Sequence, residues 1–430
     1  MNKKTVCPND RSVLVGRNNE NVYWPNAESR QPIAPFMTPS PDRPIQILIS
    51  AGEASGENYG AMLMAELRKL AGRDIQFFGV GGEKMRAAGF ETIVDSGKVA
   101  AVGITEVIKH VATIYREFFR MVAVARERKP DAAVLIDFPD FNLRLASKLH
   151  EMGVPVVYFV SPQLWAWKQR RIWRVKKFVD RMLVIFPFEQ DYYRERGVNA
   201  EYVGHPLADL APPQIPREAL AREHGLDPAK HWIALLPGSR KKEVLLNLPV
   251  MLEAAGKLGS EYEFLVPVAS TLSHEWMEEQ IGSTRVHLVS DARSALLHAR
   301  ASVVASGTAT VEAALIGNPF IVVYRVSGLS YAIGKRLVKV KNFGMINLIA
   351  GREIVPELIQ TNFTAKNVVE QLSKLISDGP GRNRMIRELE NVQSKLRQVA
   401  RVNGETAIAR AAQGVLEILA SARGHRAETD

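Results

Sequence analysis

Three small residues, Ser306, Gly307 and Thr308, stand between an apolar stretch of strand type and an alanine-rich stretch of helical type. A helix N-terminus carries partial positive charge and unpaired N–H groups, so this junction could hold a phosphate. Glu312 follows in the first turns of the same helix and could accept a hydrogen bond from a ribose hydroxyl. Many strand–helix corners look the same and bind nothing, so this motif alone predicts only a turn compatible with a phosphate.

A second loop of similar character, Gly238-Ser239-Arg240, also follows an apolar strand. Its small residues could present N–H groups to an anion, and its arginine could make planar, bidentate contacts with a diphosphate. Together the two loops predict a cradle for a nucleoside diphosphate. The alternative readings are that Arg240 is a solvated loop cation and that Glu312 is an ordinary acid near a helix N-terminus.

Acidic residues that follow apolar strands in the first half of the chain could transfer protons. Asp137 and Asp140 flank a proline at the end of an apolar strand. We expect Asp140 to cap the following helix, which leaves Asp137 as a candidate general base for an attacking hydroxyl. Glu53 and Ser55 occupy the equivalent corner after the first strand, where they could face an acceptor. His205 lies at the presumed domain junction, where a structural role is the stronger interpretation.

Several other kinds of catalytic site are excluded by missing motifs. The chain has no HExxH, GxSxG or Walker sequence, and its only cysteine, Cys7, rules out a cysteine-rich metal site and fits a reducing cytoplasm. The Gly-Val-Gly-Gly stretch that ends at Gly82 lacks the third glycine of a dinucleotide fingerprint. No Asp-x-Asp is present to hold a divalent ion on a diphosphate. We therefore expect neither a metal nor a cofactor.

The elements that must position these residues alternate between short apolar strands and helices of ordinary length. We expect strands at 45–50, 75–80, 131–137, 154–160 and 181–186, then prolines at 212, 213 and 216, then strands at 232–236, 262–266, 286–289, 301–305 and 320–324. This order predicts an α/β fold with two parallel sheets, in two Rossmann-like domains facing each other across a cleft.

The predicted domains follow from that order. Residues 45–206 form a first domain for an acceptor and residues 207–380 a second for a nucleotide. Helical patterns at 364–377 and 383–419 finish the chain, and the helices of 381–430 could cross back to the first domain or reach a second subunit in a homodimer.

The N-terminal 44 residues differ in composition from the rest of the 430-residue chain. Residues 1–44 are polar and proline-rich and have no apolar core of signal-peptide type, so we expect a disordered extension. Met37 lies just before the first strand and is a second candidate start. No stretch approaches the roughly 18 continuous apolar residues of a transmembrane helix.

Two segments combine apolar or aromatic residues with cations, in a chain whose net charge is +10. A helical pattern at 102–129 interleaves apolar and basic residues, and tryptophans punctuate a basic stretch at 165–181. A helix packed on a sheet is the plainer interpretation of 102–129, especially of its C-terminal half. Contact with a membrane surface fits both segments. The residues assigned to that contact are Val107, Ile108, Val111, Ile114, Tyr115, Phe118, Trp165, Trp167, Arg170, Arg171, Trp173 and Arg174.

Six motifs, spread in order from residue 45 to about residue 419, resemble those of the lipid-A-disaccharide synthase family (glycosyltransferase family 19). In two of them the family often has a different residue, an aspartate where this chain has Glu57 and an alanine where it has Phe138. The six motifs are Ala51-Gly52-Glu53-Ala54-Ser55-Gly56-Glu57, Asp137-Phe138-Pro139-Asp140-Phe141-Asn142, Ser161-Pro162-Gln163-Leu164-Trp165-Ala166-Trp167, Leu236-Pro237-Gly238-Ser239-Arg240, Ala305-Ser306-Gly307-Thr308-Ala309 and Asn347-Leu348-Ile349-Ala350-Gly351-Arg352-Glu353.

The resemblance implies a glycosyltransferase B architecture and a specific reaction. A 2,3-diacylglucosamine unit would pass from its UDP derivative to 2,3-diacylglucosamine 1-phosphate, giving the β-1,6-linked lipid A disaccharide 1-phosphate and UDP. The resemblance makes Asp137 the base and places Arg240, Glu312 and Asn347 on the nucleotide side. It also implies a cytoplasmic enzyme, peripheral at the inner membrane of a Gram-negative bacterium.

The sequence leaves two alternative functions open. Another sugar-nucleotide enzyme of the same architecture, such as a UDP-N-acetylglucosamine 2-epimerase, would use a non-acylated substrate. An RNA-binding protein could also be basic and carry interleaved tryptophans, but it would leave the two phosphate-type loops unexplained. We therefore expect no nucleic-acid partner.

Overall fold

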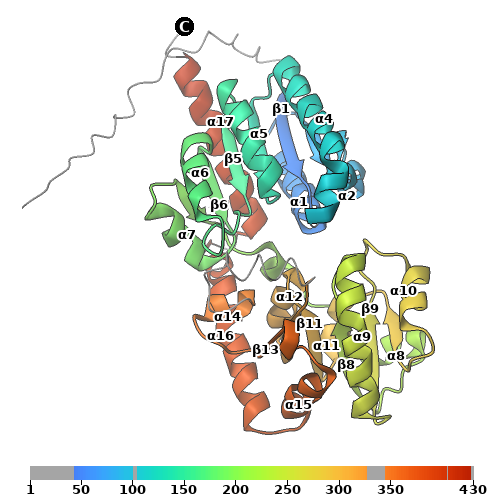
Figure 1. The fold of residues 1–430 in the computed structure, drawn as a ribbon. Coiled ribbons are helices and arrows are strands. Elements are labelled where there is room, and N and C mark those ends of the chain that lie inside the picture. The colour runs from blue at the N-terminus through green and yellow to red at the C-terminus, as the bar shows by residue number, and fades with distance from the viewer. Residues whose placement is uncertain (1–42, 100–103, 327–343, 404, 428–430) are drawn as a thin grey trace, which may run out of the picture. The chain divides into compact units, whose positions relative to one another are not determined.

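The computed structural model describes residues 43–99, 104–326, 344–403 and 405–427. Almost all of the predicted N-terminal extension, residues 1–42, lies outside this range. Both sheets of the described chain belong to one unit, which begins at Ser40. Within it the strands and helices alternate along the chain, as the pattern of apolar runs predicts (Figure 1).

In the described part of the first half, seven parallel strands form one sheet in the order β3-β2-β1-β4-β5-β6-β7. The central strands are buried on both faces, as continuous apolar runs in a parallel sheet require. The order reverses between β1 and β4, and ligands of such sheets bind beyond the carboxyl ends of the strands at this reversal. The strands are β1 (Ile45–Ala51), β2 (Ile75–Gly81), β3 (Glu91–Asp95), β4 (Ala132–Ile136), β5 (Val156–Phe159), β6 (Arg181–Val184) and β7 (Ala200–Tyr202).

Helices cover both faces of this sheet because successive side chains of a strand point to opposite faces. Ile47 and Ile49 pack into a core shared with α1, whereas Leu48 packs into a second core with α4 and α5. The helices of this half are α1 (Ala54–Leu70), α2 (Glu83–Ala87), α3 (Ser96–Val99), α4 (Ile104–Arg128), α5 (Pro139–Glu151), η1 (Gln169–Arg171), α6 (Ile172–Phe178), α7 (Pro187–Arg194) and η2 (Pro206–Asp209).

The described part of the second half forms a parallel sheet of six strands in the order β10-β9-β8-β11-β12-β13. Its strands are β8 (His231–Leu236), β9 (Tyr262–Pro267), β10 (His287–Val289), β11 (Ala301–Ala305), β12 (Phe320–Tyr324) and β13 (Glu357–Ile359). Its helices are α8 (Arg217–His224), α9 (Lys241–Leu258), α10 (His274–Ile281), α11 (Ala292–His298), α12 (Thr308–Ile316), α14 (Met345–Ala350), η3 (Gln360–Asn362) and α15 (Ala365–Ile376). The prediction of two parallel α/β sheets is confirmed.

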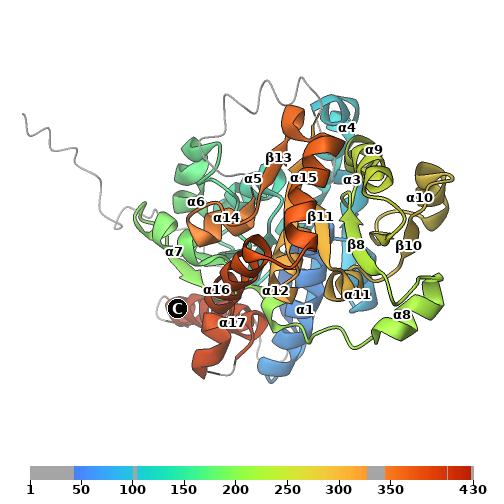
Figure 2. The ribbon, with the colours of Figure 1, turned by 90° about the horizontal axis from the view of Figure 1, so that it is seen from below.

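Two long helices end the chain and pack on different halves (Figures 1 and 2). α16 (Pro380–Asn403) packs against α12, α14 and α15 of the second half, while α17 (Ala407–Ala427) packs against α1 and the strands β4, β5 and β6 of the first. Asp209 accepts a hydrogen bond from the N–H of Ala407, 2.6 Å away, where α17 begins. Arg181 of β6 forms an ion pair with Glu417 of α17 at 2.5 Å.

The structure differs from the sequence-based elements mainly at sheet edges. β3, β7 and β13 were not predicted, and each is an edge strand of mixed or partial burial, without a continuous apolar run. The helical pattern at 383–419 is divided between α16 and α17. The predicted domain boundaries are tested by no observation and stay predictions.

Candidate active site

Asp137, Glu53 and Arg240, three of the predicted site residues, lie together. Arg240 comes from the loop after β8 in the second half, and its Nη2 lies 2.9 Å from Oε2 of Glu53, in the turn after β1. Its Nη1 lies 3.1 Å from Oε1 of Glu243, one turn further along its own chain. Glu53 and Arg240 both act electrostatically on Asp137, which follows β4. The carboxyl ends of β1, β4 and β8 therefore contribute charges to one site.

Asp137 lies in an unusual backbone turn. It and Phe138 both adopt left-handed conformations, with φ of 46° and 47°, which residues other than glycine rarely do. The carbonyl of Asp137 accepts two hydrogen bonds, from the hydroxyl of Tyr158 at 2.5 Å and from Nδ2 of Asn142 at 2.8 Å. These two side chains hold the strained peptide in place.

Asn142 extends this support to the neighbouring strand. Its Nδ2 also donates to the carbonyls of Ile136 at 3.1 Å and Ser50 at 3.2 Å, and its Oδ1 accepts from the Ser50 hydroxyl at 2.6 Å. Asn142 is fully buried, so water does not compete for these bonds. A side chain at Gly52 would collide with the Phe138 ring, which explains the glycine after β1. Together these contacts fix the ends of β1 and β4 relative to each other.

The electrostatic surroundings suit Asp137 to proton transfer near neutral pH. Burial and the nearby carboxylate of Glu53 raise the pKa of Asp137 to about 7, against the opposing effects of the Phe138 N–H and the Arg240 cation. A base whose pKa lies near the working pH is both available and able to take a proton. The partly buried position of Asp137 after β4 thus gives it the property that a general base needs.

The Gly238–Arg240 loop is organised by Glu243, an acid that the sequence analysis did not select. Oε2 of Glu243 accepts from the N–H of Ser239 at 3.0 Å, and a side chain at Gly238, whose φ is 125°, would collide with the same carboxylate. Asn247 donates to the carbonyl of Pro237 at 2.9 Å. The Ser239 N–H is therefore already bonded, and the guanidinium of Arg240 is the stronger candidate contact for an anion.

The corner before α12 has the exposure that an anion site requires. The N–H of Ser306 bonds to the carbonyl of Val323 at 2.9 Å and completes the sheet. Gly307 and Thr308 are exposed, and within the described residues no hydrogen bond uses their N–H groups. The corner thus offers two N–H groups at a helix N-terminus.

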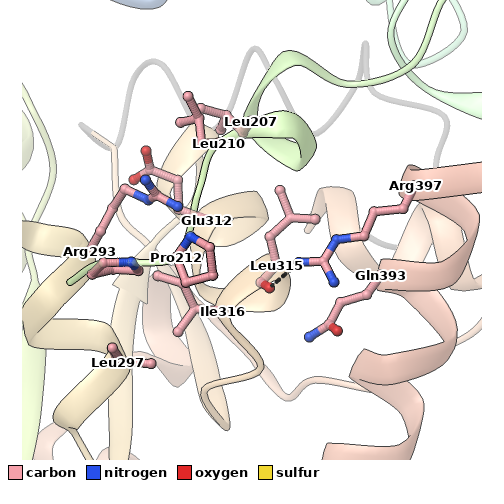
Figure 3. A pocket seen from close by; sticks show the side chains of 11 residues that line it. Leu207, Leu210, Pro212, Arg293, Leu297, Glu312, Leu315, Ile316, Gln393 and Arg397 are labelled. Carbon is pink, nitrogen blue, oxygen red and sulfur yellow. Dashed lines mark hydrogen bonds between the residues drawn. The ribbon is translucent and has the colours of Figure 1, made fainter. Parts of the chain in front are cut away.

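Glu312 points toward a pocket beside α12. Burial raises the pKa of its carboxyl, as does Asp291, while Arg293 and Lys84 oppose the rise. The pocket has a volume of about 190 Å³ and lies between α11, α12, α16 and the residues that link the halves. Figure 3 shows Glu312 and Arg293 on one side of it and Gln393 and Arg397 on the other. Lys84 belongs to α2 of the first half, so Glu312 also lies at the junction of the halves.

Asn347, which was predicted to contact the nucleotide, makes its hydrogen bonds inside the protein. Its side chain is fully buried and donates to the carbonyl of Val355 at 2.9 Å and to Oε1 of Glu357 at 2.7 Å. Its Oδ1 accepts from the N–H groups of Ile354 and Val355. The side chain of Asn347 thus supports the loop that leads to β13 from inside the protein, and its contact with the nucleotide stays a prediction.

Two further residues, His205 and Ser55, were predicted to face the acceptor or the cleft. His205 is buried, and its Nδ1 accepts from the N–H of Leu207 at 3.2 Å. Burial lowers its pKa to about 3, so the ring is neutral and structural at physiological pH. Ser55 is partly buried in the first turn of α1, next to Glu53.

Glu189 is a buried acid whose charge acts on Asp137. It was not among the residues predicted from the sequence. Its Oε1 accepts from the Ser161 hydroxyl at 2.7 Å and from Nε1 of Trp165 at 3.1 Å, and its Oε2 from the N–H of Phe186 at 3.2 Å. Burial raises its pKa to about 7, and its charge contributes to the raised pKa of Asp137. Its position as the third residue of α7 was the available signal, since acids there bond back to the N-cap.

The residues assigned to membrane contact in the tryptophan-rich segment divide into two groups. Trp165 is tied to Glu189 and packs edge-on against Phe188, and Arg171 bonds to Asp140, so both have partners within the protein. Trp173 is 53% exposed, with Arg174 over its ring at 5.4 Å. Partly buried Trp167 is covered by Lys168, and Arg170 is exposed.

The predicted amphipathic helix is α4. Its assigned contact residues also fall into two groups, one that packs against the core and one that is exposed. Ile114 and Phe118 pack against the core, whereas Val111, Tyr115 and Phe119 form an exposed stripe with Phe119 59% exposed. Phe119 was not among the predicted contacts. The side chains of Val107 and Ile108 lie outside the described residues. No described helix is both long and apolar enough to cross a membrane, and the described residues contain no cluster of three or more potential metal ligands.

Comparison with solved structures supports the fold. The chain is similar to the glycotransferase of kitacinnamycin, with a TM-score of 0.58, 15% identity and coverage of 88% of this chain and 100% of that one. It is also similar to UDP-GlcNAc 2-epimerase from Neisseria meningitidis, with a TM-score of 0.55, 12% identity and coverage of 88% and 100%. At such identities the similarities establish the two-sheet glycosyltransferase B architecture alone.

Comparison of sequences is more specific. The family model for lipid-A-disaccharide synthetase matches residues 47–411. The chain is 55% identical over 378 residues to the lipid-A-disaccharide synthase of Koribacter versatilis (strain Ellin345), covering 87% of this chain and 98% of that protein. It is 52% identical over 391 residues to that of Acidobacterium capsulatum, covering 87% and 96%. With the acid, the arginine and the exposed helix corner in place, the chain belongs to the lipid-A-disaccharide synthase family of glycosyltransferases.

Proposed function

We propose that the chain transfers 2,3-diacylglucosamine from its UDP derivative to 2,3-diacylglucosamine 1-phosphate, forming a β-1,6 linkage and releasing UDP. The observation that carries the proposal is the meeting of Asp137, Glu53 and Arg240 at the ends of three strands from both sheets. Family membership supports the choice of substrates.

In this reaction Asp137 takes the proton from the acceptor's 6-hydroxyl. The acceptor oxygen then bonds to the anomeric carbon of the donor, while the bond from that carbon to the diphosphate breaks and its electron pair leaves with UDP. Arg240 exchanges Glu53 for the departing diphosphate, and the N–H groups of Gly307 and Thr308 add partial positive charge. Placing the base and the charge on opposite sides of the anomeric carbon gives inversion.

The proposed reaction needs no metal ion. Arg240 and the α12 N-terminus supply the positive charge that a divalent ion provides in other sugar-nucleotide enzymes. On this proposal turnover continues unchanged in excess EDTA.

We further propose that the enzyme works peripherally at the inner face of the cytoplasmic membrane. Both substrates carry acyl chains, so part of each stays in lipid. The exposed stripe of Val111, Tyr115 and Phe119 and the exposed ring of Trp173 support this location, since indole and other aromatic rings favour the membrane interface.

The test is incubation with UDP-2,3-diacylglucosamine and the acylated acceptor, with UDP release and product mass both measured. We expect a tetraacyl disaccharide 1-phosphate and no turnover of UDP-N-acetylglucosamine. Asp137→Asn should bind UDP normally and lose about 10²–10⁴-fold in transfer rate. Epimerised UDP-N-acetylglucosamine, or loss of UDP affinity in Asp137→Asn, would refute the proposed reaction or the role of the base, respectively.

A further inference from the structure

Two cations converge on an exposed carboxylate next to the proposed base. Asp140 lies in the first turn of α5, three residues after Asp137. Nζ of Lys168 lies 3.3 Å from its Oδ2, and the guanidinium of Arg171 bonds to its Oδ1. The side chain of Asp140 is 58% exposed, but those of Lys168 and Arg171 are only 33% and 25% exposed. The two cations are thus more shielded from solvent than the carboxylate that they contact.

The local charge is positive beyond what Asp140 can balance. Arg170 and Arg174 flank the pair, and among the described contacts neither has an acidic partner. Asp180 is the only acid in the basic segment 168–181, and its Oδ2 accepts a hydrogen bond from the N–H of Val156 at 2.8 Å. Although partial burial raises the pKa of Asp140, the bond and charge of Arg171, with Lys168, hold it below its usual value. An anion placed here meets an excess of positive charge.

Stability alone does not explain this arrangement. Exposed ion pairs contribute roughly 0–1 kcal/mol, while Lys168 is held in a left-handed conformation, with φ of 51°, that lysine rarely adopts. That backbone turn directs Lys168 toward α5, where its Nζ also lies 4.2 Å from the centre of the Trp167 ring. The chain therefore maintains a strained residue at the position that brings a cation to Asp140.

We propose that Lys168 and Arg171 bind the phosphate monoester of the acceptor, which takes the place of the Asp140 carboxylate. This inference rests on the proposed function. The acceptor carries its reacting hydroxyl and its phosphate on opposite sides of one sugar ring. Asp140 follows Asp137 by three residues, so the chain between them spans at most roughly 11 Å. On our proposal one acceptor sugar spans these two positions, with its hydroxyl at Asp137 and its phosphate at the two cations that contact Asp140. Arginine matches phosphate with planar, bidentate donors.

A phospholipid headgroup offers the same chemistry, but the position favours the acceptor. Lys168 and Arg171 face α5 and are mostly shielded, whereas Arg170 and Trp173 of the same segment are exposed. Binding a bilayer calls for the exposed members. The shielded pair next to the proposed base suits a group on a bound substrate.

The experiment compares Arg171→Ala and Lys168→Ala with the unchanged enzyme in neutral detergent micelles. Two acceptors are used, 2,3-diacylglucosamine 1-phosphate and the same lipid without its phosphate. Losing a hydrogen bond to a charged group costs about 1.5–3 kcal/mol, so we expect the KM for the phosphorylated acceptor to rise roughly 10–100-fold. The kcat and the KM for the donor should change less than about twofold, and with the unphosphorylated acceptor the variants should match the unchanged enzyme.

Three further variants of the enzyme distinguish a phosphate site from a structural role. Lys177→Ala removes an exposed cation of the same segment that lies over the Phe178 ring, and it should leave the acceptor KM unchanged. Asp140→Asn removes the competing charge and should leave that KM unchanged or lower it. Arg171→Lys keeps the charge and should restore part of the affinity, which a purely structural role for Arg171 would not produce.

Equal losses on both acceptors would overturn the phosphate site, because the variants would then disturb the loop in general. A second result to look for is that the variants lose affinity for the acceptor only when vesicles of anionic phospholipid replace the micelles. That result would assign the two cations to lipid headgroups and would also overturn the phosphate site. If the unchanged enzyme transfers to neither acceptor, the proposed function itself fails, which is a distinguishable result.

Discussion

Arg240 has two acidic partners, one in its own half of the chain and one in the other. Glu243 shapes its loop, whereas Glu53 is the partner that a diphosphate must replace. The same cation opposes the rise in the pKa of Asp137. When a diphosphate neutralises Arg240, Asp137 loses part of that influence, so donor binding should make the base stronger just before it is needed.

The pH dependence of the reaction tests this group of residues. Asp137 must be deprotonated to act, and its pKa is raised to about 7, so kcat/KM should increase with pH, with a midpoint near pH 7 and a plateau roughly one pH unit higher. Glu53→Gln removes a negative charge that contributes to the raised pKa, and it should move the midpoint to lower pH. Glu66→Gln, in the part of α1 where the carboxylate pairs with Lys69, is the control. A midpoint that stays in place in Glu53→Gln would contradict the coupling.

Only some of these residues were predictable from the sequence. Asp137 and Arg240 follow apolar strands, and strand ends in such folds face ligands. Glu189 and Glu243 lie inside or beside helices as ordinary acids, and their roles depend on loops brought close by the fold. Asn347 shows the opposite limit, because a motif fixes its identity but not the direction of its side chain, which points inward.

At the scale of elements, the site depends on the alignment of β1 and β4. Asn142 bonds to both strand ends, and Tyr158 reaches from β5 to the same Asp137 carbonyl. The central strands were predictable because they are buried apolar runs. The turn that follows β4 was not, because nothing in the local sequence indicates two successive left-handed residues other than glycine.

Removing this support should affect catalysis more than nucleotide binding. Asn142→Ala leaves buried carbonyls without a donor, and we expect it to lower the free energy of unfolding by about 1–3 kcal/mol. Tyr158→Phe removes one bond and should cost about 0.5–1.5 kcal/mol. In both variants kcat should fall while UDP affinity, measured by calorimetry, stays unchanged. An unchanged kcat in a destabilised Asn142→Ala protein would limit Asn142 to a structural role.

At the scale of the whole molecule, exposed apolar side chains gather on one long helix. Val111, Tyr115 and Phe119 recur every four residues on α4, and Phe118 connects this surface through Phe141 to Phe138, next to Asp137. The amphipathic pattern was visible in the sequence. Which of its residues face the core was not, because that depends on how α4 packs on β3 and α5.

Association with vesicles tests the role of this surface. Val111→Ser with Phe119→Ser should reduce co-sedimentation with anionic liposomes, because buried apolar area is lost. Higher salt should weaken binding further, since each cation near the surface contributes about 1 kcal/mol. Leu70→Ser, which changes an exposed apolar residue at the far end of α1, is the control. Equal binding by all three proteins would remove α4 from the proposed membrane contact.

The return of α17 to the first sheet has a consequence for how the protein is made. The strands of that sheet are complete once Tyr202 has left the ribosome, but the helix that packs beside α1 ends near residue 427. During synthesis of the second half, the apolar surface that later meets Ala411 and Val415 is not yet covered by α17. The first half therefore reaches its final packing only after α17 has emerged from the ribosome, which follows the synthesis of the whole second sheet.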